Sequence, residues 1–169
     1  MMGKKMSKSN MPIFFDVEAS SLSGDSYPIQ IAWNDCHGDI HCYLINPFLY
    51  PDDYTDWSPE SELIHGFSRA YLRKHGHKPD YVADDMLKHL GGHTLFSDAP
   101  DFDGFWIRRL FQAVNKEIDF KFGYAIAMFE YIQPGHYKFS EKARKDAGPA
   151  HKADNDVRYL LNIYRALFY

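Results

Sequence analysis

The sequence predicts a single α/β domain that begins with an antiparallel meander of strands. Its length of 169 residues is typical of one domain. Three strand patterns occupy the first 45 residues, and from residue 58 onwards apolar residues recur mostly with a helical period. The composition, 45% hydrophobic and 17% aromatic, is sufficient to bury a core without disulfides or a structural metal.

The first three predicted strands follow one another closely. Residues 12–18 form a short apolar run that meets acidic residues, as expected for a strand buried on both faces. In residues 27–33 large apolar side chains alternate with smaller or polar ones, the period of a half-buried strand. Turn-forming residues at 37–39 lead into a returning strand at 40–45, which makes this part antiparallel.

Start and stop signals then predict six helices and one more strand. The helices are expected from Ser58, from Ser68 to Gly76, from Pro79 to Gly91, from Asp98 to Ala113, from Ser140 to Gly148 and from about Asn155, and the strand at 94–97. Ser58, Ser68, Asp98 and Ser140 are interpreted as N-caps. In the helix from Asp98, Phe102 and Trp106 belong to one apolar stripe.

The basic stretch at residues 1–11 is interpreted as a flexible tail, because no apolar segment of signal-peptide length follows it, and 12–169 as the domain. The net charge of −4 excludes a globally basic protein that coats duplex nucleic acid. No apolar run reaches the roughly 18 residues of a membrane span. The two cysteines, Cys36 and Cys42, fit a reducing compartment, so we expect a soluble, cytoplasmic protein with free thiols.

Asp16 and Glu18 are the first candidates for chemistry. Residues i and i+2 of a strand project from one face, so both carboxylates point the same way. Adjacent carboxylates repel each other unless a cation lies between them, and Mg²⁺ or Mn²⁺ with oxygen ligands meets that need. The alternative is a pair of exposed residues at a strand end, the usual meaning of an isolated D-x-E tripeptide.

A second acidic group follows the fourth predicted strand. Asp98 is interpreted as a helix N-cap, and Asp101 as a first-turn acid that complements the helix dipole. Asp103 has no capping role and lies between Phe102 and Trp106, close to the stripe that the helix buries. Burial of an unpaired carboxylate costs on the order of several kcal/mol, and a metal ion is one partner that offsets this cost.

His151 and Asp156 form the third region. In a continuous helix they would be about 140° apart and would not share a site. The preceding Gly148-Pro149-Ala150 places His151 in a loop instead, from which it can reach Asp156 on the first turn of the last helix. Asp154 is a competing ligand that also fits an N-cap, with Asn155 as the alternative cap.

Two histidine pairs, His75 with His77 and His89 with His93, have spacings that a zinc site could use. Neither pair has cysteines nearby, and two glycines interrupt the helix between His89 and His93. We therefore expect all four histidines to be solvent-exposed.

Taken together, these residues resemble the DEDD-type 3′–5′ exonucleases of the histidine subclass, relatives of the proofreading subunit of bacterial DNA polymerase III, oligoribonuclease and ribonuclease T. The segments that carry the resemblance are Asp16-x-Glu18, Ile64-His65-Gly66-Phe67-Ser68 followed by Leu72, Phe102-Asp103 and His151-x-Ala153-x-x-Asp156. Each segment alone is weak evidence, but the four occur in the family's order between residue 13 and about residue 165.

The resemblance implies a ribonuclease H-like fold, with a mixed sheet that starts antiparallel, continues with parallel strands and carries helices on both faces. It also implies that two divalent cations, Mg²⁺ or Mn²⁺, are held by four acids and flank the scissile phosphate. The matching acids are Asp16, Glu18, Asp103 and Asp156. His151 matches the general base that takes a proton from the attacking water, and the products would be nucleoside 5′-monophosphates.

Substrate contacts follow from the same resemblance. Ala19, Ser20 and Leu22 match the residues that hold the terminal nucleotide, and His65 and Phe102 match the lining of its pocket. Leu22 and Phe102 could sandwich a terminal base. The alternatives are core packing for Phe102 and a capping or packing role for His65.

We therefore predict an enzyme, a metal-dependent 3′–5′ exonuclease whose partners are the 3′ ends of single-stranded DNA, RNA or short oligonucleotides. A non-catalytic adaptor that binds nucleic-acid ends or a protein is the main alternative, and a phosphodiesterase of small nucleotides is a third reading. The sequence leaves a homodimer open.

Overall fold

The computed structural model of the chain describes residues 11–126 and 137–168, apart from the side chains of 137–139. Most of the tail expected at 1–11 therefore lies outside the described residues. Its last residue, Met11, is joined to the domain, because its backbone N–H donates to the carbonyl oxygen of Cys36 at 3.1 Å.

A five-stranded mixed sheet forms the centre of the domain, in the order β3-β2-β1-β4-β5. The strands are β1 (Ile13–Ala19), β2 (Pro28–Asn34), β3 (Ile40–Leu44), β4 (Thr94–Ser97) and β5 (Lys121–Tyr124). The pairs β1/β2 and β2/β3 are antiparallel, whereas β1/β4 and β4/β5 are parallel. The expected sheet, antiparallel at its start and parallel afterwards, is confirmed.

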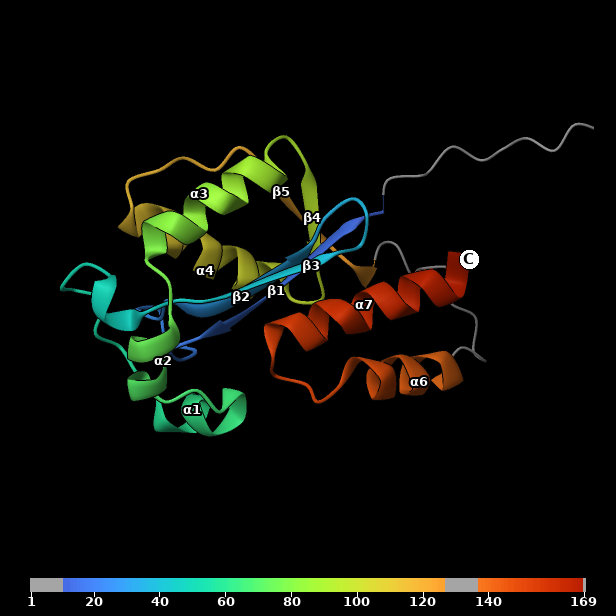
Figure 1. Cartoon of the computed structure of the whole chain (residues 1–169), viewed down its shortest axis with the longest axis horizontal. Helices are drawn as coiled ribbons and strands as arrows, with labels where there is room; N and C mark the ends of the chain where they lie inside the picture. Colours follow the sequence, from blue (N-terminus) through green and yellow to red (C-terminus); the bar gives the residue numbers. More distant parts are fainter. Residues whose placement is uncertain (1–10, 127–136, 169) are drawn as a thin grey trace, which may run out of the picture.

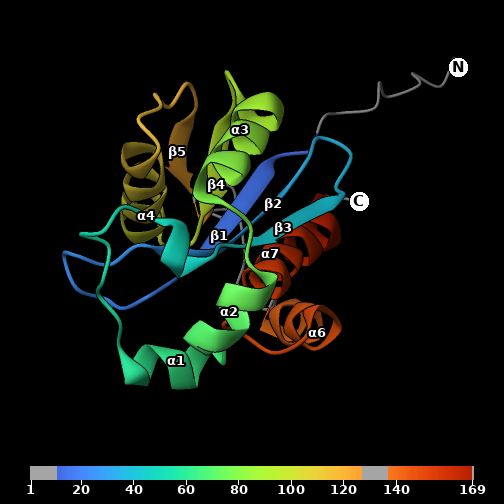
Figure 2. The same cartoon turned by 60° about the vertical axis from the view of Figure 1, so that its left-hand side comes forward.

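Helices cover both faces of this sheet (Figures 1 and 2). They are α1 (Pro59–His65), α2 (Arg69–His75), α3 (Pro79–Leu90), α4 (Pro100–Ala113), α6 (Tyr137–Ala147) and α7 (Ala153–Phe168), with a short 3₁₀ helix η1 (Pro47–Leu49). α3 and α4 pack on one face, α7 packs on the other with α6 outside it, and α1 and α2 lie at one end (Figure 1).

The alternation of side chains along β1 decides what each face carries. Phe15 and Val17 enter the core under α3 and α4, whereas Phe14 enters the smaller core under α7. Since neighbours in a strand point to opposite faces, Asp16 and Glu18 lie on the α7 face. The acidic pair thus faces the helix that carries Asp156.

Several expected elements differ in detail. The helix expected from Ser140 begins at Tyr137, and the Ser140 hydroxyl lies 2.8 Å from the Tyr159 hydroxyl instead of capping a helix. α7 begins at Ala153, so Asp154 lies inside its first turn and forms an ion pair with Arg158 (3.6 Å).

β5 was not expected, because it has four residues and contains a glycine. A Cβ at Gly123 would lie 3.0 Å from the ring of Phe96 on β4, closer than real Cβ atoms normally approach. Close packing of the two strands therefore requires glycine, the residue that weakens a strand prediction.

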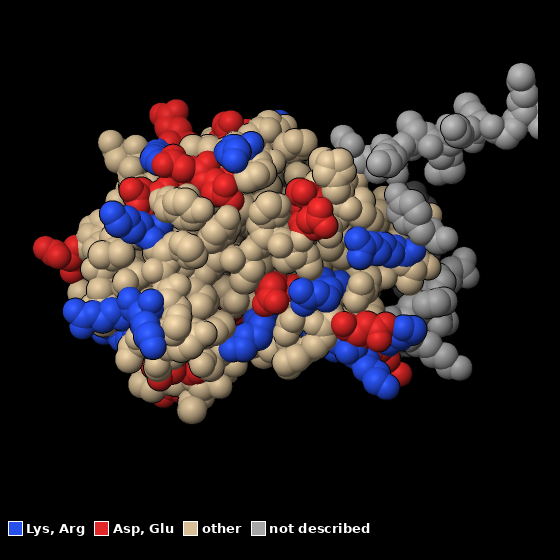
Figure 3. Space-filling model, viewed as in Figure 1, with Lys and Arg blue, Asp and Glu red and all other residues tan. Residues whose placement is uncertain are grey.

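None of the helices in the described residues is long and apolar enough to cross a membrane. Lys and Arg side chains on the face in Figure 3 occur in small groups, separated by acidic and uncharged residues. This distribution agrees with the exclusion of a protein that binds duplexes through bulk positive charge.

Candidate metal-binding active site

The site starts at the end of β1, where the strand becomes irregular. Glu18 pairs with Gln30 on β2, but the next residue, Ala19, pairs with Pro28, so the register shifts between Glu18 and Ala19. Such bulges re-aim side chains next to active sites. Here the chain after the bulge runs along the cavity described below.

A second pair of acids comes from the β4–α4 junction, which lies beside β1 because β4 and β1 are parallel neighbours. Asp103, in the first turn of α4, is only 3% exposed, and the Ser97 hydroxyl donates to its carboxylate. Asp98 does not cap α4 as expected: the N-cap is Ala99, with no side-chain cap hydrogen bond. The carboxylate of Asp98 is placed beside Asp16 and Asp103 instead.

The third contribution comes from the start of α7, which is fixed to the sheet by Gln30. The side-chain oxygen of this buried glutamine accepts the N–H of Ala153 at 3.0 Å. Asp156 follows one turn later. Its carboxylate accepts a hydrogen bond from the backbone N–H of His151 (2.8 Å) and forms an ion pair with Arg144 (2.7 Å). His151 lies in the loop before α7, as expected, in the left-handed conformation (φ 61°).

Replacing Gln30 by methionine is expected to loosen this attachment. The N–H of Ala153 lacks an intrahelical partner at the start of α7, and leaving it buried without one costs about 1–3 kcal/mol. We expect the free energy of unfolding in urea to fall by about that amount, and Mn²⁺ binding, read by calorimetry, to weaken with it. Gln112→Met, at an exposed position of α4, is the matched control. Unchanged stability and Mn²⁺ affinity in Gln30→Met would refute the positioning role.

Two groups of three carboxylates result, and they share one member. Asp16, Glu18 and Asp156 form one group, and Asp16, Asp98 and Asp103 form the other. Within each group the ligand oxygens lie within 4.8 Å of one another. All four acids predicted from the sequence are thus brought together, and Asp98 joins them.

The pKa values of these acids are raised by burial and by mutual repulsion. Burial raises the pKa of Asp16 well above its usual range, and Asp103, Glu18 and Asp156 raise it further. Burial and the nearby Asp156 raise the pKa of Glu18 to about 7, against the opposing effect of Lys152. The pKa of Asp103 is raised to about 8, chiefly by burial. Such a cluster is electrostatically unfavourable until protons or cations neutralise it.

A cavity of about 430 Å³ opens beside these acids. It is lined by residues from β1, the loop after it, α1, the start of α4, α6 and the loop before α7, among them Asp16, Glu18, Asp98, Asp156, Arg144, His65 and His151. Carboxylates, a cationic side chain and an imidazole therefore border one space, which suits a phosphate ester held by metal ions.

No protein-family model matches the sequence, and no curated protein matches it significantly. Solved structures do. E. coli exonuclease I in its zinc-bound complex with single-stranded DNA is 16% identical (TM-score 0.63), matching 91% of this chain and 39% of its own. The same enzyme with a dA16 oligonucleotide is 15% identical (TM-score 0.63; 92% and 42%). Exonuclease I from Methylocaldum szegediense is 18% identical (TM-score 0.62; 91% and 40%).

The chain has a ribonuclease H-like fold. Its strand order, with helices on both faces of the mixed sheet, is shared with those exonucleases. It spans about two fifths of the exonuclease I chains that it matches. At such low identity the likeness establishes the fold and leaves the chemistry to the residues of this chain.

The substrate-binding candidates occupy different positions in this ribonuclease H-like fold. Ala19 and Leu22 line the cavity, and Leu22 is 76% exposed. Ser20 does not line it: the residue is fully buried, its hydroxyl donates to Asp56 (3.1 Å), and Ser21 lines the cavity instead. Phe102 is 57% exposed, so the core-packing alternative is wrong.

Phe102 lines a second cavity of about 280 Å³ next to the first, together with Leu22, Phe105 and Trp106. Leu22 and Trp106 border both cavities, so the two spaces lie next to each other. An apolar, aromatic cavity beside an acidic one fits a nucleotide, because the base can stack on aromatic side chains while the phosphate lies near metal ions held by the acids.

His65 is buried and lines the acidic cavity. Its Nδ1 accepts the N–H of Phe67 at 3.1 Å, and its Nε2 has no hydrogen-bond partner among the described residues. Burial and the neighbouring Lys152 lower the pKa of His65 to about 4, so the ring is neutral at pH 7 and carries its proton on Nε2. A neutral donor at the cavity is thus left without a protein acceptor.

Proposed function

We propose that this chain is a metal-dependent 3′–5′ exonuclease that removes nucleoside 5′-monophosphates from the 3′ ends of single-stranded DNA or RNA. The observation that carries the proposal is the pair of carboxylate groups that share Asp16 beside the cavity. The similarity in fold to exonuclease I bound to single-stranded DNA supports it.

The acids fit two divalent cations of the Mg²⁺ or Mn²⁺ type. All candidate ligands are oxygens, and the pKa values of Asp16, Glu18 and Asp103 are raised by burial first and by neighbouring charge second, so a bound cation would stabilise their ionised forms. Asp16, Glu18 and Asp156 would hold one ion, and Asp16 and Asp103, with Asp98, the other. Bound there, the pair supplies stabilisation of the attacking and leaving oxygens of an in-line displacement.

His151 is proposed as the general base. It lines the cavity beside Asp16 and Glu18, and its backbone is fixed by the hydrogen bond to Asp156. The imidazole can take the proton of a water molecule that attacks a phosphate in the cavity. The loop thus couples the base to one of the metal-binding acids.

His151→Asn is expected to lower kcat by about 10²–10⁴-fold, the usual contribution of a general base. Asparagine is chosen because it tolerates the left-handed backbone conformation at this position, so loss of the imidazole is not confused with strain. The rise in Tm caused by Mn²⁺ should stay as in the wild type, since the metal ligands remain. A wild-type kcat in this variant would exclude His151 as the base.

The terminal base is proposed to lie in the aromatic cavity, between Leu22 and Phe102. The scissile phosphate, which links the terminal nucleotide to the rest of the strand, would then lie among the acids. The Nε2–H of His65 then donates to a polar group of the terminal nucleotide, which satisfies its unused hydrogen-bonding capacity. Stacking tolerates any base, so little sequence preference is expected.

Phe102→Ala is expected to raise KM for oligonucleotides by about 5–150-fold, because base stacking on an aromatic ring contributes roughly 1–3 kcal/mol. Tyr81→Ala is the matched control, since Tyr81 is similarly exposed (52%) but lies on α3. Steady-state kinetics on one fluorescent oligomer would measure both variants. Equal KM values would remove Phe102 from the binding site.

The deciding experiment compares matched DNA and RNA oligomers of several lengths, labelled at the 5′ or the 3′ end, with Mg²⁺, Mn²⁺ or EDTA. The proposal expects metal-dependent shortening from the 3′ end and release of 5′-monophosphates. Digestion from the 5′ end, or no digestion, contradicts it. Binding of 3′ ends without digestion would instead support the non-catalytic adaptor, and cleavage of dinucleotides alone would support a small phosphodiesterase.

We further propose that the protein works in the cytoplasm. Cys36 and Cys42 are both free, as expected in a reducing compartment.

Two basic side chains near the site are already engaged. Arg144 is paired with Asp156, and Lys152 donates to the carbonyl oxygen of His65, which leaves few cationic side chains there to contact a long phosphate backbone. We therefore expect contacts restricted to the strand end and a shallow salt dependence of binding.

A further inference from the structure

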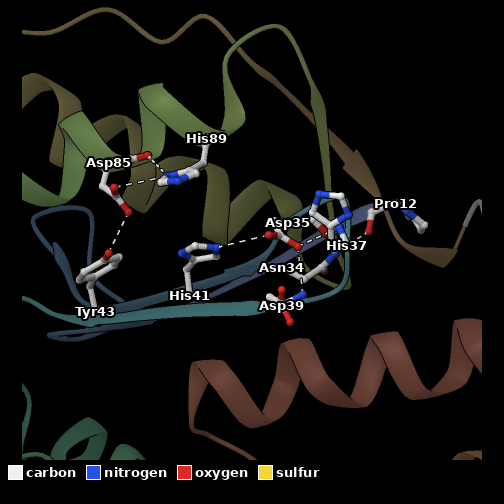
Figure 4. A network of polar contacts seen from close by, with 9 residues as sticks. All are labelled: Pro12, Asn34, Asp35, His37, Asp39, His41, Tyr43, Asp85 and His89. Atoms are coloured by element: carbon white, nitrogen blue, oxygen red, sulfur yellow. Dashed lines mark hydrogen bonds and ion pairs between the residues drawn. The ribbon is translucent and has the colours of Figure 1, made fainter. Parts of the chain in front are cut away.

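A cluster of two histidines and an aspartate lies on the face of the sheet opposite to the acidic cavity. His41 comes from β3, and Asp85 and His89 come from successive turns of α3 (Figure 4). One potential ligand atom from each residue lies within 4.8 Å of the other two. His41 pairs across the sheet with Trp33, whose side chain enters the core under α3, whereas Asp16 and Glu18 face α7.

Each member of the cluster is oriented by a second group. One ring nitrogen of His41, Nε2, lies 3.8 Å from the carboxylate of Asp35, which is itself fixed by the backbone N–H groups of His37 (2.8 Å) and Asp39 (3.0 Å). Nδ1 of His89 lies 2.9 Å from the backbone carbonyl oxygen of Asp85. Nδ1 of His89 is therefore paired with an oxygen, which leaves its Nε2 for a ligand, whereas Nε2 of His41 only approaches a carboxylate.

The carboxylate of Asp85 is oriented in the same manner. The hydroxyl of Tyr43 donates to its Oδ2 at 2.8 Å, and its Oδ1 lies 3.3 Å from Nδ1 of His89, the nitrogen that also faces the backbone carbonyl of Asp85 (Figure 4). Hydrogen bonds of this kind, from histidine to oxygen and from a donor to the carboxylate, surround metal ligands in proteins and fix their orientation.

We propose that His41, Asp85 and His89 form a binding site for a transition-metal dication of the Zn²⁺ type, which joins β3 to α3. Two imidazoles and one carboxylate suit Zn²⁺, whereas Mg²⁺ prefers oxygen ligands alone. Three protein ligands leave the fourth position to water. The side chains are partly exposed, between 16% and 29%, so an ion can enter from solvent.

The competing reading is a set of ion pairs between protonated histidines and aspartates, without a metal. The two imidazole rings lie with their centroids 4.9 Å apart. Ion pairs alone do not explain why potential ligand atoms of two imidazoles and one carboxylate gather within 4.8 Å of one another, whereas a metal site needs that convergence.

The ion would act as a clamp at the edge of the sheet. β3 is an edge strand, and it is held to the rest of the sheet by β2 alone. A ligand set that spans β3 and α3 adds a link between that edge and the helix above it. An ion that binds only the native state raises its stability by mass action.

The test is Zn²⁺ binding to the whole chain, with excess Mg²⁺ to suppress binding at the carboxylates of the cavity. Wild type, His41→Gln and His89→Gln are compared, with His93→Gln as the matched control, because His93 is an exposed histidine just beyond α3. Equilibrium dialysis gives the number of zinc ions bound, and thermal unfolding in the same excess of Mg²⁺ gives Tm with and without Zn²⁺.

We expect wild type and His93→Gln to bind one zinc ion more than the other two variants. At zinc 100-fold above Kd, their Tm should rise by about 5–10 °C relative to Mg²⁺ alone, and this rise should be absent from His41→Gln and His89→Gln. Equal zinc stoichiometry and an equal Tm shift in all four proteins would overturn the proposal.

Should a variant fail to fold, Co²⁺ added to the wild type gives an independent answer. Visible absorption bands of the intensity given by four- or five-coordinate cobalt with imidazole ligands are expected. Only the weak spectrum of six-coordinate cobalt with oxygen ligands would refute the histidine site. Nuclease activity is not the readout, so this result and the test of the exonuclease are independent.

Discussion

Replacing Asp103 by asparagine is expected to abolish nearly all nuclease activity and, without metal, to make the protein more stable. Asparagine is almost isosteric with aspartate, and its side-chain oxygen can still accept the hydrogen bond of Ser97. The variant removes a buried negative charge that burial, Asp98 and Glu18 disfavour. In EDTA at pH 8, we expect a gain of about 1 kcal/mol or more in the free energy of unfolding.

The activity should change in the opposite direction. Loss of one ligand from the second carboxylate group weakens a cation proposed to stabilise the transition state by several kcal/mol, so a fall of at least about 10²–10³-fold in kcat is expected. The wild type should gain Tm on addition of Mn²⁺, and the variant should gain much less.

Asp80→Asn is the control for Asp103→Asn, since Asp80 is also a first-turn aspartate but lies exposed on α3, away from the cavity. It should change neither activity nor the response to Mn²⁺. A near-wild-type rate for Asp103→Asn would remove Asp103 from the site. Lower stability of that variant in EDTA would mean that the folded wild-type protein compensates the negative charge of Asp103.

The chemistry-bearing part of the fold was predictable because it depends on local pattern. The alternation along β1 places Asp16 and Glu18 on one face, whatever else the chain does. The Gly148-Pro149 sequence places His151 outside a helix, and the structure puts it in a loop. The order of the acidic segments then suggested that remote carboxylates converge, and Asp16 is indeed the member common to both groups.

The parts that were missed depend on contacts between distant segments. Asp98 precedes Ala99-Pro100 and therefore looks like a cap, and only the position of β1 beside β4 shows that it approaches Asp16. Gln30 reads as a polar residue of a strand, and its bond to Ala153 spans 123 residues.

The histidines illustrate the same limit. Asp85 and His89 have the i, i+4 spacing of one helix face, which a sequence shows. Their neighbour His41 comes from a strand 44 residues before Asp85 and 48 before His89, so the sequence alone offered only His93 as a histidine partner of His89, a pair that was set aside. His75, His77 and His93 are exposed as expected, whereas the His89 side chain is packed against His41 and is only partly exposed, at 29%.

The second large effect concerns pH. In EDTA, the protein is expected to lose stability as the pH rises from about 6.5 to 8. Glu18 and Asp103 have raised pKa values, about 7 and about 8, in the folded protein, so in this range the folded state binds more protons than the unfolded state. Stability then falls with pH, by about 1–2 kcal/mol per pH unit near pH 7.

The window has a lower limit because His65 acts in the opposite direction. Its pKa is lowered to about 4, so between that value and about 6.5 the unfolded state binds the extra proton and stability rises with pH. Above pH 6.5 this contribution fades, and from about pH 7.5 the carboxylates alone determine the slope.

Urea unfolding at pH 6.5, 7.25 and 8 measures the slope, with EDTA and with Mn²⁺. The cations replace the protons that the acids lose, so Mn²⁺ should flatten the decline and stabilise the protein most at pH 8. The Asp103→Asn variant should show a smaller slope in EDTA than the wild type. A stability in EDTA that is constant or increases over this range would mean that the acids are not driven together by the fold, and the case for two cations among them would fail with it.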